Sequence, residues 1–296
     1  MDLLNKYGYA LSGEEIASRI KTVEDNLPET AAPDVLKLCF SIMDLTTLKS
    51  NDTVASVKAL VEKANGVMEA FPGYPLPASI CVYPNFASVV RDVRCCPELH
   101  VTTVAACFPS SQSFLDVKVQ ECRLAVRDGA DEIDIVLALN HFLAGEYDAA
   151  AEEIVAVRKA LDEEGEKAGR KITLKVILET GLLAEPDLIA RASFLAMEAG
   201  ADFIKTSTGK VEVNATPTAA LVMCECIRLF NLKTGRKVGF KAAGGISNAK
   251  DALEYYHIVS SVLGEEWLNK ELFRFGVSRL GNSLVSAIEG KAVYYF

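Results

Sequence analysis

The sequence has few residues of the kinds that bind zinc or form disulfide frameworks. Its 296 residues include only three histidines, far apart at positions 100, 141 and 257, and none of its eight cysteines forms a Cys-x-x-Cys pair. We therefore expect no metal site. The cysteines fit core thiols in a reducing cytoplasm better than a set of disulfides.

The chain also lacks the features of membrane and nucleic-acid-binding proteins. No apolar run reaches the ~18 residues of a membrane-spanning helix, and the N-terminus has no basic region followed by an apolar core, so we expect no secretory signal. A net charge of −9 without any lysine or arginine block argues against a nucleic-acid surface. Small molecules remain as partners, including anionic ones. A homodimer is compatible with the sequence, which does not indicate an oligomeric state.

What the sequence does contain is an alternation of strand-like and helical segments. The predicted strands lie near 36–44, 79–83, 100–108, 132–138, 172–179, 202–207, 238–243 and 272–277. Between them are segments of helical periodicity, near 53–65, 113–128, 144–168, 185–199, 217–231 and 248–261. Eight such units predict an α/β protein with a TIM (β/α)8 barrel. The absence of a Gly-x-Gly-x-x-Gly turn weakens a Rossmann fold.

The predicted domain organisation is simple. No low-complexity segment or flexible linker divides the chain, so residues 36–296 are expected to form a single catalytic barrel domain. Residues 1–35 form an N-terminal extension with a short amphipathic helix that opens on Ser12.

Strand alternation places four ionisable side chains inside this barrel. Successive residues of a strand point to opposite faces, and the face opposite the aliphatic one carries Asp134, Lys175, Lys205 and Lys241. A barrel interior is normally packed with branched apolar residues, so a polar cluster there is costly unless it is functional.

Lys205 and Lys241 are the strongest candidates for catalysis. Burial, together with the charge of a second lysine, would keep one amine neutral, and a neutral lysine amine attacks carbonyl carbons to form Schiff bases. Alternatively, Lys205 extends its amine to water at a strand end. Lys175 is either a substrate-binding residue or a structural partner of Asp134 or Glu179. Asp134 is either catalytic or only a counter-ion.

Several glycine turns suggest a phosphate site at the ends of the strands. The Thr206–Lys210 turn resembles a nucleotide-binding loop, but Ile204 and Val211 do not fit that motif. Exposed backbone N–H groups at two later helix starts would add an anion site, as in many barrels. The candidate contacts are Thr206, Gly209, Lys210, Gly244, Gly245, Ser278 and Arg279. Asp44 is either a turn cap or a site residue, and Cys81 either packs in the core or lines the site.

These motifs resemble those of the deoxyribose-phosphate aldolases, a family of class I aldolases with a TIM-barrel fold. The matching segments, in family order, are MDLTTL (43–48), ICVYP (80–84), GADEID (129–134), LKVILETG (174–181), GADFIKTSTGK (200–210) and GFKAAGGI (239–246). The resemblance extends from about residue 40 to 285 and does not cover the segment before residue 36.

The resemblance implies reversible cleavage of 2-deoxy-D-ribose 5-phosphate to D-glyceraldehyde 3-phosphate and acetaldehyde, in deoxyribonucleotide catabolism and without a cofactor. It implies that Lys205 forms the Schiff base, that Lys241 lies beside it and that Asp134 relays protons. It also implies phosphate contacts near Gly209–Lys210, Gly244–Gly245 and Ser278. Family members often have arginine at position 247 and a second serine at position 279, where this chain has Ser247 and Arg279.

The sequence allows alternatives for the function, for Arg279 and for the C-terminal tail. A different lysine-dependent aldolase or a transaldolase, and a sugar-phosphate-binding barrel without activity, are the alternatives to the aldolase function. Arg279 either replaces the cation missing at Ser247, or it points to solvent or pairs with an acidic neighbour. The aromatic tail 292–296 either packs on the surface or folds over the barrel, bringing Tyr294 or Tyr295 near the site; in the second case its deletion would slow turnover without lowering thermal stability.

Overall fold

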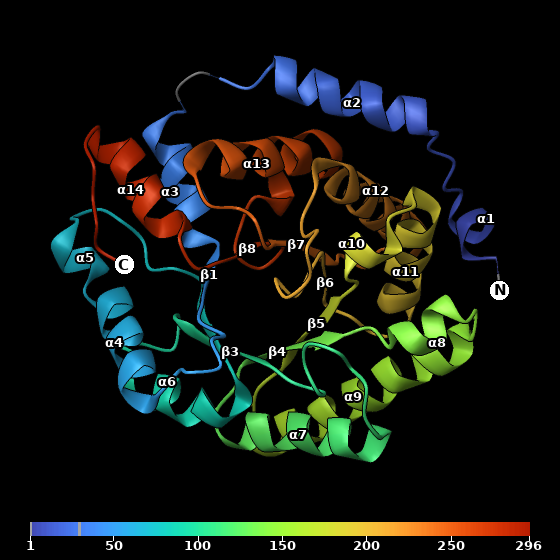
Figure 1. The fold of residues 1–296 in the computed structure, drawn as a ribbon, viewed down its shortest axis with the longest axis horizontal. Helices are drawn as coiled ribbons and strands as arrows, with labels where there is room; N and C mark the ends of the chain where they lie inside the picture. The colour runs from blue at the N-terminus through green and yellow to red at the C-terminus, as the bar shows by residue number, and fades with distance from the viewer. Residues whose placement is uncertain (1, 29–30) are drawn as a thin grey trace.

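Eight parallel strands close into a barrel in the computed structural model, which describes residues 2–28 and 31–296 (Figure 1). Each strand pairs with the next along the chain, and β8 pairs with β1 to complete the ring. This closed order confirms the predicted TIM barrel. The strands are β1 (Met43–Thr46), β2 (Ser79–Val82), β3 (His100–Val104), β4 (Glu132–Val136), β5 (Thr173–Ile177), β6 (Phe203–Lys205), β7 (Gly239–Ala243) and β8 (Phe273–Val277).

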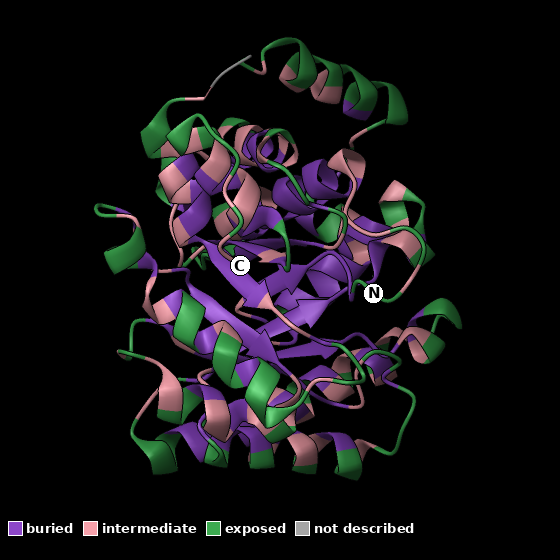
Figure 2. Ribbon diagram, turned by 60° about the vertical axis from the view of Figure 1, so that its left-hand side comes forward, coloured by how far each residue is buried: buried purple, intermediate pink, exposed green. Residues whose placement is uncertain are grey.

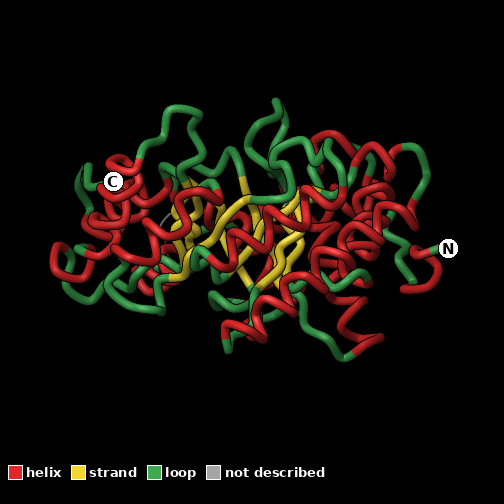
Figure 3. Tube along the Cα trace, turned by 90° about the horizontal axis from the view of Figure 1, so that it is seen from below, coloured by secondary structure: helices red, strands yellow, loops and turns green. Residues whose placement is uncertain are grey.

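Helices surround the strands, and the loops lie mostly at the two ends of the barrel (Figure 3). Along the described chain no helix has both the length and the apolar character needed to cross a bilayer. The helices after β1 are α4 (Val54–Asn65), α5 (Val67–Ala70), α6 (Ala87–Val93), α7 (Leu115–Arg127), α8 (Leu139–Leu143), α9 (Tyr147–Ala168), α10 (Thr180–Leu183), α11 (Pro186–Glu198), α12 (Pro217–Thr234), α13 (Ala249–Leu263) and α14 (Leu280–Glu289), with short 3₁₀ turns η1 (Pro84–Phe86) and η2 (Glu265–Trp267).

The N-terminal extension contains α1 (Leu3–Tyr7) and α2 (Gly13–Asp25), and α2 lies across α12 and α13 outside the barrel (Figure 1). The predicted start of α2 is confirmed, because Ser12 and Glu15 form a reciprocal capping box. Residues 1, 29 and 30 of the predicted 1–35 extension lie outside the described residues. Its boundary at residue 36 stays a prediction, and it falls within the next helix.

The predicted strand at 36–44 is wrong over most of its length. The structure has α3 (Pro33–Ser41) there, and β1 begins only at Met43. Leu36, Cys39 and Phe40 are all buried, and their i, i+3, i+4 spacing matches one face of a helix that begins with Pro33 at its first position. A short apolar run does not distinguish a buried strand from one buried helix face.

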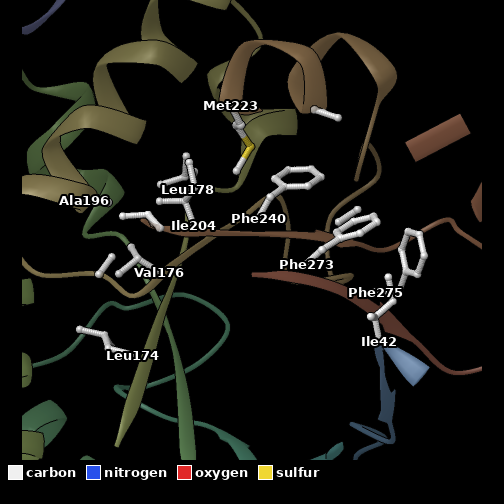
Figure 4. Packing of buried hydrophobic residues seen from close by; sticks show 14 of the residues in the cluster. Ile42, Leu174, Val176, Leu178, Ala196, Ile204, Met223, Phe240, Phe273 and Phe275 are labelled. Atoms are coloured by element: carbon white, nitrogen blue, oxygen red, sulfur yellow. The ribbon is translucent and has the colours of Figure 1, made fainter. Parts of the chain in front are cut away.

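The main core lies between the barrel and its helices. Figure 4 shows part of it, with Ile204, Phe240 and Phe273 pointing outward from their strands and Met223 of α12 beside Phe240. Figure 2 shows the strands and the inner faces of the helices as buried. Outward apolar positions therefore alternate with inward polar ones, as the strand pattern predicts.

Candidate active site

The inside of the barrel contains a charged cluster drawn from six strands. Within the described residues it consists of seven acidic or basic side chains, each at most 4% exposed: Asp44, Glu132, Asp134, Lys175, Lys205, Lys241 and Arg274. The predicted inward direction of Asp134 and the three lysines is confirmed. The structure adds three members to those four: Asp44, which was a candidate without an assigned face, and two that were not predicted as site residues.

Asp134 is the centre of the cluster. Its Oδ1 accepts a hydrogen bond from Lys175 Nζ at 3.0 Å, and its Oδ2 accepts one each from Lys205 and Lys241 at 2.8 Å. Strand register produces this arrangement, because Lys175 is the partner of Asp134 across β4–β5 and Lys205 is the partner of Lys241 across β6–β7. Burial opposes ionisation of Asp134, but the three lysines outweigh it and hold the pKa of this carboxyl far below its usual value.

Glu132 and Arg274 are the two cluster members that were not predicted as site residues. Glu132 precedes Asp134 on β4 and pairs with Arg274 of β8. Arg274 donates to Asp44 Oδ1 at 2.5 Å and to Glu132 Oε1 at 2.7 Å. Glu132 also accepts a hydrogen bond from Lys175. Both residues have a signal in the sequence: Glu132 shares the strand parity of Asp134, and Arg274 alternates with the outward Phe273 and Phe275.

The lysines differ in how many carboxylates they contact. Among described residues, Lys241 pairs with Asp44 at 2.5 Å and with Asp134, and Lys175 pairs with Glu132 and Asp134, with Asp44 3.7 Å away. Within the same described set, Lys205 pairs with Asp134 alone. It is therefore the amine whose positive charge receives the least compensation.

The direction of each pKa shift follows from these contacts. Burial lowers the pKa of Lys205, Asp134 opposes this, and the charge of Lys241 lowers it further, so the net shift is downward. Burial also acts against the ammonium of Lys241, but Asp134 and Asp44 outweigh it and raise the pKa of that lysine. The two lysines thus shift in opposite directions, which makes Lys205 the better nucleophile.

Asp44 is the second carboxylate that pairs with Lys241, and it also pairs with Arg274. Burial alone would raise its pKa, but Lys241, Arg274 and Lys175 lower the pKa of Asp44 to about 2. Its Oδ2 has no well-aligned hydrogen bond among the described side chains although Lys241 Nζ is 2.5 Å away. Asp44 and Lys175 are both fully buried. This burial is compatible with a role through neighbouring side chains, and the place in the substrate site expected for both residues stays a prediction.

Lys205 is the last residue of β6, so its amine faces the mouth of the barrel, formed by the loops after the carboxyl ends of the strands. The following loop is held from both sides. Thr206 Oγ1 accepts from Ala243 N at 3.0 Å, and Glu179 accepts from Thr208 N at 3.1 Å and from Thr208 Oγ1 at 2.5 Å. Glu179 therefore fixes this loop and does not pair with Lys175.

Lys210 extends across the mouth. Its Nζ donates to the carbonyl oxygen of Leu48, which follows β1, at 2.5 Å. On the same side of the mouth a small apolar group contains Leu48, Cys81 and Val104, packed against Tyr83 and Phe108. Cys81 is fully buried and faces inward as predicted, as part of this packing.

The remaining phosphate candidates lie after β7 and β8. Gly244 and Gly245 both have positive φ, 81° and 83°, and Gly245, Ser278 and Arg279 are exposed. At the start of α13 the N–H of Ser247 is already bound by Asp251. At the start of α14, Arg279 stands in the cap position, and no side chain caps the helix. The second helix start is therefore the more open of the two.

The C-terminal tail is docked on the side of the barrel, with its end between α14 and α4 (Figure 1). Asn282 accepts hydrogen bonds from the N–H groups of Tyr295 and Phe296, and Tyr295 donates its hydroxyl to the carbonyl of Lys63 at 2.8 Å. Tyr294 is 91% exposed. This position corresponds to the surface packing that was one of the two alternatives.

The geometry is that of a barrel enzyme with a buried lysine amine at its mouth. A family model described as DeoC/LacD family aldolase matches residues 39–261, and the chain belongs to this family. It is an aldolase, a carbon–carbon lyase.

Its curated relatives include deoxyribose-phosphate aldolases of animals. The enzyme of Homo sapiens is 42% identical over 252 residues, which cover 81% of this chain and 76% of that protein. The enzyme of Mus musculus is 42% identical over 267 residues, covering 86% and 79%. A solved deoxyribose phosphate aldolase from Aeropyrum pernix has a TM-score of 0.63 and 23% identity, covering 95% of this chain and 98% of that one, which supports the fold.

Proposed function

We propose that this protein cleaves 2-deoxy-D-ribose 5-phosphate reversibly to D-glyceraldehyde 3-phosphate and acetaldehyde, with Lys205 as the Schiff-base lysine. The observation that carries the proposal is the pairing of Lys205 with one carboxylate, while Lys175 and Lys241 each pair with at least two. The activity printed for the human and mouse relatives gives the substrate.

In the first half of the reaction, the neutral amine of Lys205 attacks C1 of the open-chain sugar and water leaves, giving an iminium ion. Asp134, with Lys241 and a water molecule, accepts the proton of the C3 hydroxyl. The C2–C3 electron pair then moves onto the iminium, which becomes an enamine as glyceraldehyde 3-phosphate departs.

In the second half, C2 of the enamine takes up a proton and water hydrolyses the resulting iminium to acetaldehyde and free Lys205. The charges of the cluster favour this order of reaction steps. The iminium adds a positive charge to the cluster, and conversion to the enamine removes it, so the surrounding lysines promote bond cleavage.

The phosphate group is proposed to bind at the mouth, between the loop after β6 and the starts of α13 and α14. Supporting groups are the Lys210 amine, the glycine pair 244–245, Ser278 and Arg279, which all follow strand ends. Lys210 would exchange the Leu48 carbonyl for a phosphate oxygen, a stronger acceptor.

An assay of the purified protein tests the proposal directly. Incubation with deoxyribose 5-phosphate should release acetaldehyde and glyceraldehyde 3-phosphate in equal amounts, and Lys205→Ala should release neither. Preference for a longer ketone donor over acetaldehyde in the synthetic direction would support another lysine-dependent aldolase or a transaldolase. Binding of the sugar phosphate without turnover would indicate a binding protein.

Two further aspects belong to the proposal. A cytoplasmic location is supported by the eight cysteines, all of which are free thiols in the structure. A homodimer stays compatible with the sequence; the structural relative from Aeropyrum pernix is described as tetrameric.

A further inference from the structure

Arg274 is a large cation fully enclosed in the barrel, and it has no place in the reaction steps above. It lies on β8 beside Lys241 of β7, its register partner, and it is 1% exposed. Its guanidinium contacts one oxygen of Asp44 and both oxygens of Glu132, the longest of these contacts being 3.2 Å. Burying a charged guanidinium in this way costs free energy, so we expect its charge to have a role in the site.

Arg274 reaches the reacting lysine through two intermediate pairs. Asp44 contacts Arg274 through Oδ1 and Lys241 through Oδ2. Glu132 contacts Arg274 and also Lys175. Lys241 and Lys175 in turn flank Asp134, the carboxylate bound to Lys205.

Resting on the function proposed above, we propose that Arg274 is a positioning residue for catalysis: it pairs with Asp44 and Glu132 and is the fourth basic group beside three carboxylates, so that Lys205 carries the free amine. With Arg274, Lys175 and Lys241 charged, three cations balance three carboxylates in the described part of the cluster, and a neutral Lys205 makes the whole neutral. Without Arg274, a protonated Lys205 would be needed for the same balance.

Other titratable groups near Lys205 do not alter this count. Cys81 of β2 is buried, and burial raises the pKa of its thiol, so it stays neutral. His100 of β3 contacts Glu132 and not Lys205, with its Nδ1 2.7 Å from Glu132 Oε1. The facing charged groups are those of the cluster: Asp44 of β1, Glu132 and Asp134 of β4, Lys175 of β5, Lys241 of β7 and Arg274 of β8.

The test measures the pH dependence of reductive trapping of acetaldehyde by sodium borohydride. Each variant is titrated beside the wild type in the same buffers, so that the pH dependence of the reductant affects both midpoints equally. Arg274→Met should move the midpoint of trapping upward by about one pH unit or more, with a roughly tenfold loss of trapping below the midpoint. Glu132→Gln, which removes a negative charge, should move it downward.

Two variants separate charge from structure. Arg274→Lys keeps the charge, and Glu132→Gln combined with Arg274→Met removes one charge of each sign. Both should restore the midpoint to within about half a pH unit of wild type, even where stability falls. Arg228→Met is a matched control, because Arg228 pairs with Glu225 on the outside of the barrel, and it should leave the midpoint unchanged.

The inference is overturned if folded Arg274→Met titrates like wild type. If Arg274→Met does not fold, Glu132→Gln decides, and an unchanged or upward midpoint overturns it. Failure of the proposed function gives a different result, because wild-type trapping would then be absent or would modify a lysine other than Lys205.

Discussion

Lys205 and Lys241 are register partners on adjacent strands, and both donate to the same oxygen of Asp134 at 2.8 Å. Two ammonium groups this close to one oxygen repel each other. The repulsion is relieved by losing a proton from the lysine with fewer carboxylates. Lys241 keeps its proton because it also pairs with Asp44.

Replacement of Lys241 by leucine tests this relationship. Burial and the charge of Lys241 both lower the pKa of Lys205, so removing that charge should raise this pKa and favour the ammonium. In Lys241→Leu, Schiff-base formation should begin at higher pH, and turnover at neutral pH should fall at least tenfold. The measurement is trapping of acetaldehyde as a function of pH. An unchanged midpoint in a folded variant would mean that Lys241 acts only through proton transfer.

The contact between Glu179 and Thr208 should determine how well the enzyme binds the phosphate end of its substrate. Thr208 Oγ1 donates to Glu179 and accepts from Lys210 N at 3.0 Å, so it connects the strand end to the lysine at the mouth. Thr208→Val removes both bonds and should raise KM for deoxyribose 5-phosphate roughly tenfold, as the loss of about 1.5 kcal/mol implies. Thr208→Ser, which keeps the hydroxyl, is the control. A larger effect on unphosphorylated deoxyribose would contradict a role in phosphate binding.

Arg279 is expected to supply the cation that Ser247 does not. It is exposed at the start of α14, where a guanidinium can add a two-pronged contact to phosphate worth about 1.5–3 kcal/mol. Arg279→Ala should raise KM for deoxyribose 5-phosphate roughly tenfold or more and leave cleavage of unphosphorylated deoxyribose almost unchanged. Steady-state kinetics on both substrates give the answer, and an equal loss on both would assign Arg279 to the fold.

The docked tail changes the expectation for its removal. Phe296 packs on Phe40 with ring centres 6.0 Å apart, and Asn282 holds the last two residues. Deleting 292–296 should therefore lower the free energy of unfolding by about 2 kcal/mol and the melting temperature by about 4 °C. This replaces the expectation of unchanged stability. Tyr294→Ala is the control and should melt like wild type, since Tyr294 is 91% exposed. Lost turnover in that variant would show that the tail reaches the mouth during catalysis.

The sequence predicted the barrel and much of its interior for a physical reason. Strand parity is strict, so Asp134, Lys175, Lys205 and Lys241 could be assigned to one face from their positions alone. The same parity applies to Glu132 and Arg274, which were not predicted as site residues. Their pairing depends on closure of the barrel, since β8 comes near β4 only across its interior.

Local ambiguity explains the other differences. The segment 36–44 is apolar enough for a strand. Helix α3 has only nine residues, so its buried positions give a helical pattern too short to be distinguished from a strand. The predicted strand 100–108 ends at Val104, because Ala106 and Cys107 take positive φ in the loop that follows. The docking of the tail rests on tertiary contacts with Asn282 and Lys63 that no local pattern contains.

The most direct test of the account is to trap the protein with acetaldehyde and borohydride and then to map the modified peptide by mass spectrometry. We expect a single ethyl adduct on Lys205, within the peptide that contains residues 203–210. The adduct and all turnover should disappear in Lys205→Ala. An adduct on Lys241 or Lys175, or full trapping by Lys205→Ala, would contradict the assignment of the free amine.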